Sequence, residues 1–92
     1  MTVRIHTKLA GVTQDEFDAV HKHVMAGEPA KGLIFHSSAP MDGGWCVIDF
    51  WESRQDYDAS APRVQQAVAA AGVTMPGPPE VEEFPVYETW QP

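Results

Sequence analysis

Apolar and polar residues alternate at the start of the chain. Over residues 2–9 the apolar side chains fall on one side of an extended chain and the basic ones on the other: Val3, Ile5 and Leu9 against Arg4, His6 and Lys8. A period of two is typical of a β-strand that buries one face. The pattern therefore predicts a first strand with one apolar side.

A helix is predicted next. Thr13 and Glu16 have the spacing of a capping box, in which each side chain bonds the backbone of the other. Apolar residues follow at helical spacing, namely Phe17, Val20 and Val24. Gly27, with Pro29 two residues on, is a helix stop signal. We expect a helix that begins near Gln14 and ends before the glycine.

Residues 32–52 predict a β-hairpin. Two runs rich in β-branched and aromatic residues flank a turn signal at Asp42 and Gly43. A two-residue turn or a four-residue loop at this point places His36 opposite Asp49, whereas a three-residue loop would shift the register by one. The first two possibilities make the histidine and the carboxylate a cross-strand pair.

This register sorts the hairpin onto two faces. One face is almost entirely apolar and is predicted to lie against helices: Leu33, Phe35, Ser37, Cys46, Ile48 and Phe50. The other face combines aromatic bulk with an ionisable pair, a mixture typical of a pocket wall: Ile34, His36, Ser38, Trp45, Val47, Asp49 and Trp51.

The remainder of the chain predicts a helical region and a last strand. Ser53 is a helix cap, and an apolar helical stripe runs from there to Gly72. Pro62 either kinks this helix or begins a second segment, because proline is tolerated only in a first turn. Residues 75–80 read as a stiff connector, and residues 81–90 as a strand at an edge or end.

The element order is strand, helix, strand, strand, helix, strand. This order predicts one α+β domain over residues 1–92 with the ferredoxin-like split βαβ (βαββαβ) fold, a four-stranded antiparallel sheet with two helices on one face. The covered face is predicted to carry Val3, Ile5, Leu33, Phe35, Ile48, Phe50, Phe84 and Val86. The uncovered face, with Ile34, Trp45, Val47, Trp51 and Tyr87, is then a candidate interface.

Composition limits the partners. The 92 residues carry 13 acidic and 6 basic side chains and a net charge of −7, which disfavours nucleic acid and anionic membranes. No apolar run is long enough for a membrane span, and no secretion signal is visible, so we expect a cytoplasmic protein. Cys46 is the only cysteine, which excludes an internal disulfide and suggests a buried thiol on the apolar hairpin face.

The chain resembles the dimeric α/β-barrel superfamily, which includes antibiotic-biosynthesis monooxygenase-like domains, small polyketide cyclases and many uncharacterised short bacterial proteins. The resemblance covers the whole chain and rests on its length, its element order and residues 32–36, 44–53 and 84–87. It implies a homodimer and a pocket. It does not imply one reaction, because members range from oxygenases to cyclases, decarboxylases and haem-handling enzymes.

His36 and Asp49 are the candidate catalytic residues. A carboxylate that orients an imidazole raises its basicity, so the pair could take a proton from an acidic carbon or a phenol. The alternative is a polar pair that satisfies itself at the dimer interface.

The candidate ligand-binding residues are His6, Ser38, Trp51 and Tyr87. Trp51 and Tyr87 could stack on a planar ligand, and the Tyr87 hydroxyl could donate to an oxyanion. His6, by alternation, is expected on the same face as His36. Two histidines and a carboxylate are metal-ligand types, and haem would need an axial histidine, but the spacing is diagnostic of neither. We predict no metal and no cofactor, and assign His21 and His23 no role.

Two hypotheses follow. The first is a dimeric small-molecule enzyme, a cofactor-independent oxygenase or cyclase that uses the His36/Asp49 base on an aromatic or polyketide-like substrate. The second is a non-catalytic small-ligand-binding or scaffold dimer.

Overall fold

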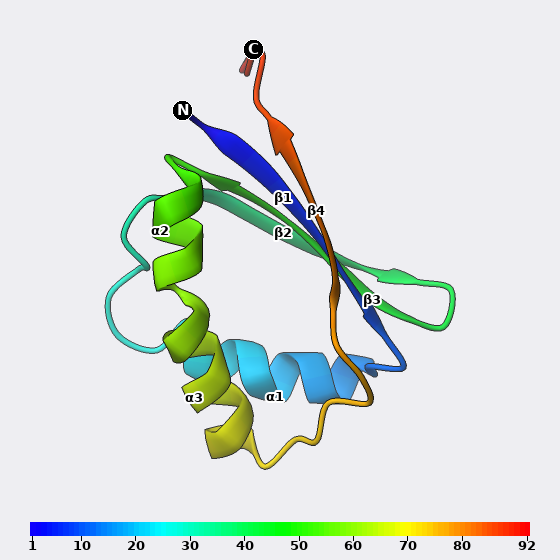
Figure 1. Ribbon diagram of the computed structural model, residues 1–92. Coiled ribbons are helices and arrows are strands. Elements are labelled where there is room, and N and C mark those ends of the chain that lie inside the picture. The colour runs from blue at the N-terminus through cyan, green and yellow to red at the C-terminus, as the bar shows by residue number, and fades with distance from the viewer.

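Four antiparallel strands form one sheet, and the helices lie on one of its faces (Figure 1). The computed structural model describes residues 1–92. In chain order the elements are β1 (Val3–Ala10), α1 (Gln14–Val24), β2 (Leu33–Met41), β3 (Gly44–Trp51), α2 (Arg54–Ala59), α3 (Ala61–Ala71) and β4 (Glu80–Pro85). The strand order β2-β3-β1-β4 is that of the predicted ferredoxin-like α+β fold.

The hairpin register is the predicted one. Asp42 and Gly43 form a two-residue turn, in which Gly43 takes a φ of 74° that other residues rarely adopt. His36 therefore pairs with Asp49. The register is regular from Met41 back to Phe35 and shifts only between Phe35 and Leu33, at the far end of β2.

The pairing of β1 with β3 overturns the predicted assignment of the faces. Ile5 lies opposite Asp49, and His6 lies opposite Ile48. Directly paired residues share a face of the sheet. The apolar side of β1 is therefore on the same face as Asp49, and His6 is on the other.

The helices cover the face of the hairpin that we expected to be open, whereas Val3 and Ile5 of β1 lie on the covered face as predicted. Aromatic contacts to α1 and α2 mark this face through His36, Trp45 and Trp51. Phe35, Ile48, Phe50 and Phe84, predicted beneath the helices, lie on the uncovered face, as does Cys46 opposite Lys8. The prediction was wrong because it treated the most apolar face of the hairpin as the covered one. The register of β1 against β3 determines which face of the hairpin is covered, and no short turn connects these two strands.

α1 has the predicted cap and is fastened to α3. Thr13 and Glu16 form the reciprocal capping box, with 3.0 Å from the Thr13 backbone nitrogen to Glu16 Oε1 and 3.2 Å from the Glu16 nitrogen to Thr13 Oγ1. At the other end Arg63 donates from Nε to the Val24 carbonyl at 2.9 Å and from Nη2 to the Ala26 carbonyl at 3.3 Å. A cation at a helix C-terminus satisfies carbonyls that lack helical partners.

Pro62 begins a second helical segment, the second of the two predicted alternatives. α2 ends at Ala59, and α3 starts at Ala61 with the proline in its first turn, where its missing N–H is not needed. The predicted single helical region is thus two helices in succession.

β4 is shorter than predicted and ends at Pro85. Val3, the first residue of β1, pairs with Pro85, and the Val86 nitrogen makes a last bond of 3.0 Å to the Thr2 carbonyl. Residues 86–90 are not strand.

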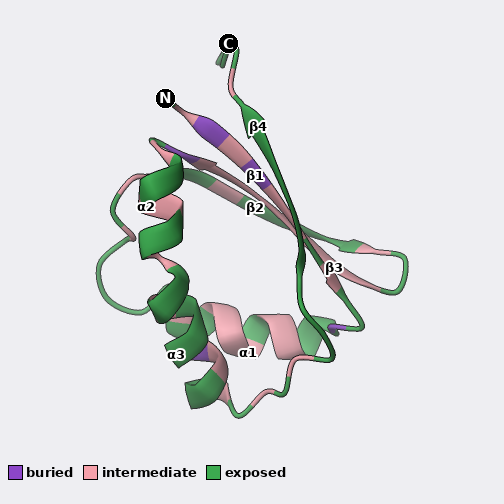
Figure 2. Cartoon of the chain, viewed as in Figure 1, coloured by how far each residue is buried: buried purple, intermediate pink, exposed green.

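The core is small for a chain of this length. Only Val3, Ile5, Val12, Trp51 and Ala67 are buried. Most of the remaining sheet and all of β4 are intermediate or exposed, as the colouring in Figure 2 shows. Neither the space between the layers nor the outer face of the sheet is sealed from solvent.

Candidate functional site

His36 and Asp49 form a direct pair on the helix-covered face. Nδ1 of His36 lies 2.6 Å from Oδ1 of Asp49, and the two side chains keep 25% and 17% of their surface exposed. The hydrogen bond to Asp49 raises the pKa of His36 above its ordinary 6.5, although burial acts in the opposite direction. His36 is therefore a stronger base than a free imidazole.

The carboxylate fixes which ring nitrogen is free. An ionised Asp49 can only accept, so His36 Nδ1 must carry the proton of the hydrogen bond. In the neutral ring the lone pair is then on Nε2. That nitrogen is buried and has no hydrogen-bond partner in the protein. Most buried polar atoms in proteins have a hydrogen-bond partner, so this nitrogen is free to accept a proton from another molecule.

Aromatic rings from α1 continue the site away from the pair. The ring of His21 stacks on His36 with centroids 5.0 Å apart and planes inclined by 19°. Phe17 also stacks with His21, with centroids 5.3 Å apart, and Trp45 stacks on Phe17 at 5.4 Å. From the sequence, His21 was assigned no role. Its position four residues after Phe17, on the apolar stripe of the helix, was the signal that could have found it.

Trp51 and Tyr57 form a second aromatic contact on the same face. Trp51, two residues after Asp49, is 4% exposed and meets Tyr57 of α2 edge to face at 6.0 Å. Burial raises the pKa of Tyr57 above 10, and the negative charge of Asp49 acts in the same direction. Its phenol therefore stays protonated at neutral pH. From the sequence, Tyr57 was expected only as part of a helical stripe.

Two of the expected ligand-binding residues do not lie near the pair. His6 is on the uncovered face, where its ring lies 5.1 Å from Phe84. Tyr87 follows the end of β4 and is 99% exposed. Ser38 shares the face of His36 by alternation but is exposed. Of the predicted wall residues, only Trp51 lies buried on the covered face.

The residues considered as metal ligands do not converge. His6 is separated from His36 and Asp49 by the thickness of the sheet, because β1 pairs His6 with Ile48. No group of three or more histidine, cysteine, aspartate or glutamate side chains is placed to hold one ion. These three residues therefore do not form a facial ligand set.

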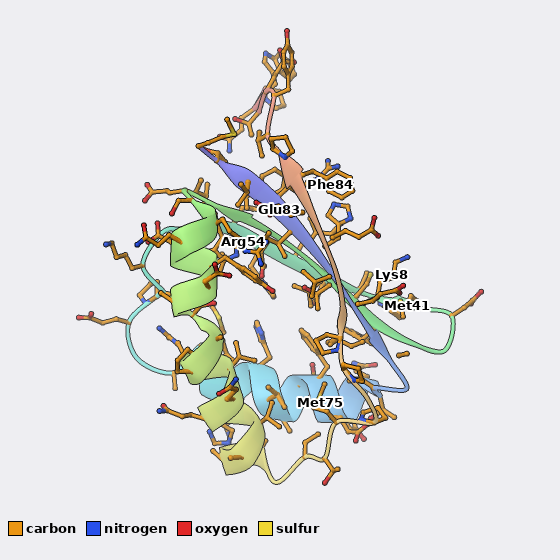
Figure 3. The ribbon with its side chains drawn as sticks, viewed as in Figure 1. Lys8, Met41, Arg54, Met75, Glu83 and Phe84 are labelled. Carbon is orange, nitrogen blue, oxygen red and sulfur yellow. The ribbon has the colours of Figure 1, made fainter.

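An ion pair crosses from the helices to the edge strand. Arg54 of α2 donates from Nη1 to Glu83 Oε1 at 2.7 Å and from Nε to Asp58 Oδ1 at 2.8 Å (Figure 3). Its guanidinium also lies over the Tyr57 ring at 5.4 Å. These contacts tie α2 to β4 on the face that holds the pair.

The uncovered face has a groove of its own. It is lined by six apolar side chains with a few polar ones: Arg4, Ile34, Phe35, Phe50, Pro85, Val86, Tyr87, Glu88, Thr89, Trp90 and Gln91. Ile34 and Phe35 are 54% and 59% exposed, and Trp90 is 79% exposed. These three side chains are among the large hydrophobic residues that one chain leaves exposed.

The fold has known structural relatives, although no protein-family model and no curated protein matches the sequence. A candidate antibiotic biosynthesis monooxygenase from Chloroflexus aurantiacus J-10-fl superposes with a TM-score of 0.71 at 18% identity, over 98% of both chains. SnoaB, a cofactor-independent oxygenase from Streptomyces nogalater, superposes with a TM-score of 0.61 at 15% identity, over 96% of this chain and 94% of that one.

A third neighbour shows how widely the fold is used. A point variant of MhuD, with two manganese protoporphyrin IX molecules bound per active site, superposes with a TM-score of 0.66 at 22% identity over the whole of both chains. The chain thus has the ferredoxin-like fold of antibiotic biosynthesis monooxygenase-like proteins. At these identities the likeness concerns the fold. Because one neighbour is cofactor-independent and another holds a metal porphyrin, the fold does not choose the chemistry.

No helix of the structure is both long and apolar enough to cross a bilayer.

Proposed function

We propose that this chain processes a small planar molecule and that His36, oriented by Asp49, is its general base. The observation that carries the proposal is the arrangement around one imidazole. Nδ1 is bonded to a carboxylate at 2.6 Å, and Nε2 is buried without a partner. A positioned base with a raised pKa contributes about 10²- to 10⁴-fold to a proton transfer.

The first chemical step follows from this arrangement. His36 Nε2 takes a proton from an acidic carbon or a phenol of the substrate, which becomes an anion. The imidazolium that forms is stabilised by Asp49. The ring is 25% exposed, so a substrate has access to the imidazole, and binding has to bring its acidic proton up to the shielded nitrogen.

The substrate class is an aromatic or polyketide-like compound. Trp51 is packed in the core on the same face as the pair, and its Nε1 is a buried donor without a partner. The protonated phenol of Tyr57 is a second donor at the same aromatic contact. The resulting anion can react with dioxygen, as in cofactor-independent oxygenation, or attack a carbonyl, as in aldol cyclisation. Both reactions begin with the same proton transfer and need no bound cofactor.

We further propose that the protein is a homodimer joined through the uncovered face. Only five side chains are buried within one chain, and the groove beside Phe35 and Phe50 exposes aromatic surface. A second copy would cover this surface. It would also place His36 and Asp49 away from the interface, because they lie on the other side of the sheet.

A binding or scaffold role without catalysis is the second candidate. The groove beside Tyr87 and Trp90 favours it, because that groove contains most of the exposed aromatic surface and is separate from the histidine pair. In that case His36 would matter for stability alone.

The test of the general base compares His36 with a second histidine that serves as the control. His36→Ala and His23→Ala are compared with the parent protein, since His23 is an exposed residue of α1. Each is incubated with phenols, anthrones and β-dicarbonyl compounds, and dioxygen consumption and product mass are recorded. We expect turnover that falls at least about 100-fold in His36→Ala and stays unchanged in His23→Ala. Equal turnover in both variants, or binding of these compounds without turnover in the parent, favours the binding role.

A further inference from the structure

The contact between His21 and His36 joins α1 to the sheet at the proposed base. The two imidazoles are nearly parallel, at 19°, with centroids 5.0 Å apart. The ring of Phe17, one helical turn earlier on α1, stacks with His21 at 5.3 Å and 17°. α1 has no buried residue, so its contact with the sheet in this region depends on these rings and on the Phe17–Trp45 stack.

Arg63 holds the helix in the position that makes this stack possible. Its guanidinium bonds the carbonyls of Val24 and Ala26, one turn after His21. The capping box at Thr13 fixes the other end of the same helix. α1 is thus fixed at both ends, and the His21 ring has two aromatic neighbours, Phe17 and His36.

The charges around the two rings are few. α1 contributes Asp18, and β3 contributes Asp49. Tyr57 of α2 is neutral at neutral pH, and Arg63, the only charged residue of α3, is engaged with carbonyls. Glu83 of β4 is bonded to Arg54 of α2. The basic side chains of β1 point to the other face.

We infer that His21 is a positioning residue for His36: it holds the plane of the His36 ring and restricts the stacked pair to one proton at a time. This inference rests on the proposed function for its catalytic meaning, although the coupling between the rings can be measured without a substrate. The proton belongs to His36, because only that ring is bonded to a carboxylate. A second proton would place two like charges in one stack.

The direction of the two pKa shifts agrees with this geometry. The hydrogen bond to Asp49 raises the pKa of His36. Burial lowers the pKa of His21, and the nearby His36 lowers it further against the opposing effect of Asp18 and Asp49. As the pH falls, His36 is protonated first. His21 stays neutral during catalysis at neutral pH and acts as an uncharged aromatic support.

The coupling is tested by nuclear magnetic resonance titration of the histidine ring protons in the parent protein and in His36→Phe. Phenylalanine keeps an aromatic ring in the stack and removes its charge. We expect the midpoint of His21 to rise in the variant, because the charged neighbour that lowers it is gone. His23, an exposed histidine on the same helix, is the internal reference and stays unchanged. An unchanged His21 midpoint in a folded His36→Phe protein overturns the inference.

The positioning role is tested with two substitutions of His21. His21→Ala removes the ring, and we expect kcat to fall about tenfold. His21→Phe restores the stack without a titratable group, and we expect it to recover kcat to within about threefold of the parent. His23→Phe is the control for a histidine change on α1. If His21→Phe is as impaired as His21→Ala, the ring has no positioning role, and that part of the inference is wrong.

These outcomes separate the two proposals. Full turnover in His36→Ala refutes the general base and leaves the titration result in force. Independent titration of His21 and His36, together with loss of turnover in His36→Ala, refutes the inference and leaves the base in place.

Discussion

Ile5 lies directly opposite Asp49 in the sheet, and this pairing puts the carboxylate on the covered side. Ile5 is fully buried at 0% exposure, so the face that holds it is the inner one. The histidine pair is therefore between the sheet and the helices, at a distance from the exposed aromatic groove.

Replacing Asp49 with asparagine is expected to lower the pKa of His36. The hydrogen bond to the carboxylate is the main cause that raises this pKa, and a neutral amide cannot stabilise the imidazolium to the same extent. Titration of the His36 ring protons checks the shift. Glu52→Gln, which removes an exposed charge just after β3, serves as the control. A His36 midpoint that is equal in Asp49→Asn and the parent would contradict the proposed cause.

The two histidines are expected to give the free energy of unfolding a maximum near pH 6.5. The folded pKa of His36 is raised, so its stabilisation is fully present below 6.5 and is lost as the pH rises through the folded value. The folded pKa of His21 is lowered, so its contribution is present above 6.5 and is lost as the pH falls. Urea unfolding between pH 5 and pH 9, at one fixed protein concentration, measures the curve.

Comparing the free energy of unfolding of the parent with that of His36→Phe measures the contribution of His36 above pH 6.5. Above pH 6.5 the parent is expected to lose stability with rising pH relative to the variant. A relative stability that rises instead would mean that the His36–Asp49 bond does not favour the protonated ring in the folded state.

Two adjacent glycines of the hairpin turn are expected to differ in their tolerance of alanine. Gly43 has a φ of 74° and open space around it, so Gly43→Ala meets only backbone strain of about 1–2 kcal/mol. A side-chain carbon on Gly44 would lie 2.3 Å from the Leu9 carbonyl oxygen, which is backbone of β1 and cannot rotate away. Gly44→Ala is therefore expected to reduce the free energy of unfolding by more than Gly43→Ala does. Equal losses in urea unfolding would show that β1 and β3 can separate there without cost.

A charge on the uncovered face is expected to weaken the proposed dimer. Phe35 is 59% exposed in one chain and lines the groove, so Phe35→Asp would bury a carboxylate between two copies. Sedimentation velocity over a concentration series measures the association, with Gln66→Asp on α3 as the control. We expect at least a tenfold weaker association for Phe35→Asp alone. A parent protein that stays monomeric over the whole series would refute the dimer.

Several elements were predictable because their signals are local. The capping box at Thr13 and Glu16 lies within one helical turn, and Pro62 divides α2 from α3 through its own missing N–H. The pairing of His36 with Asp49 was also accessible, since a tight turn at Asp42 and Gly43 carries the register along both strands.

The sequence alone thus determined the order of the elements and predicted the histidine–carboxylate pair for a two-residue or four-residue turn. Tertiary structure decided which side of the sheet the pair occupies, because the register of β1 against β3 joins segments that no short turn connects. It also brought His21 onto His36 and separated His6 and Tyr87 from them. Contacts between distant segments depend on how helices and strands pack, and residue spacing within one segment does not contain that information.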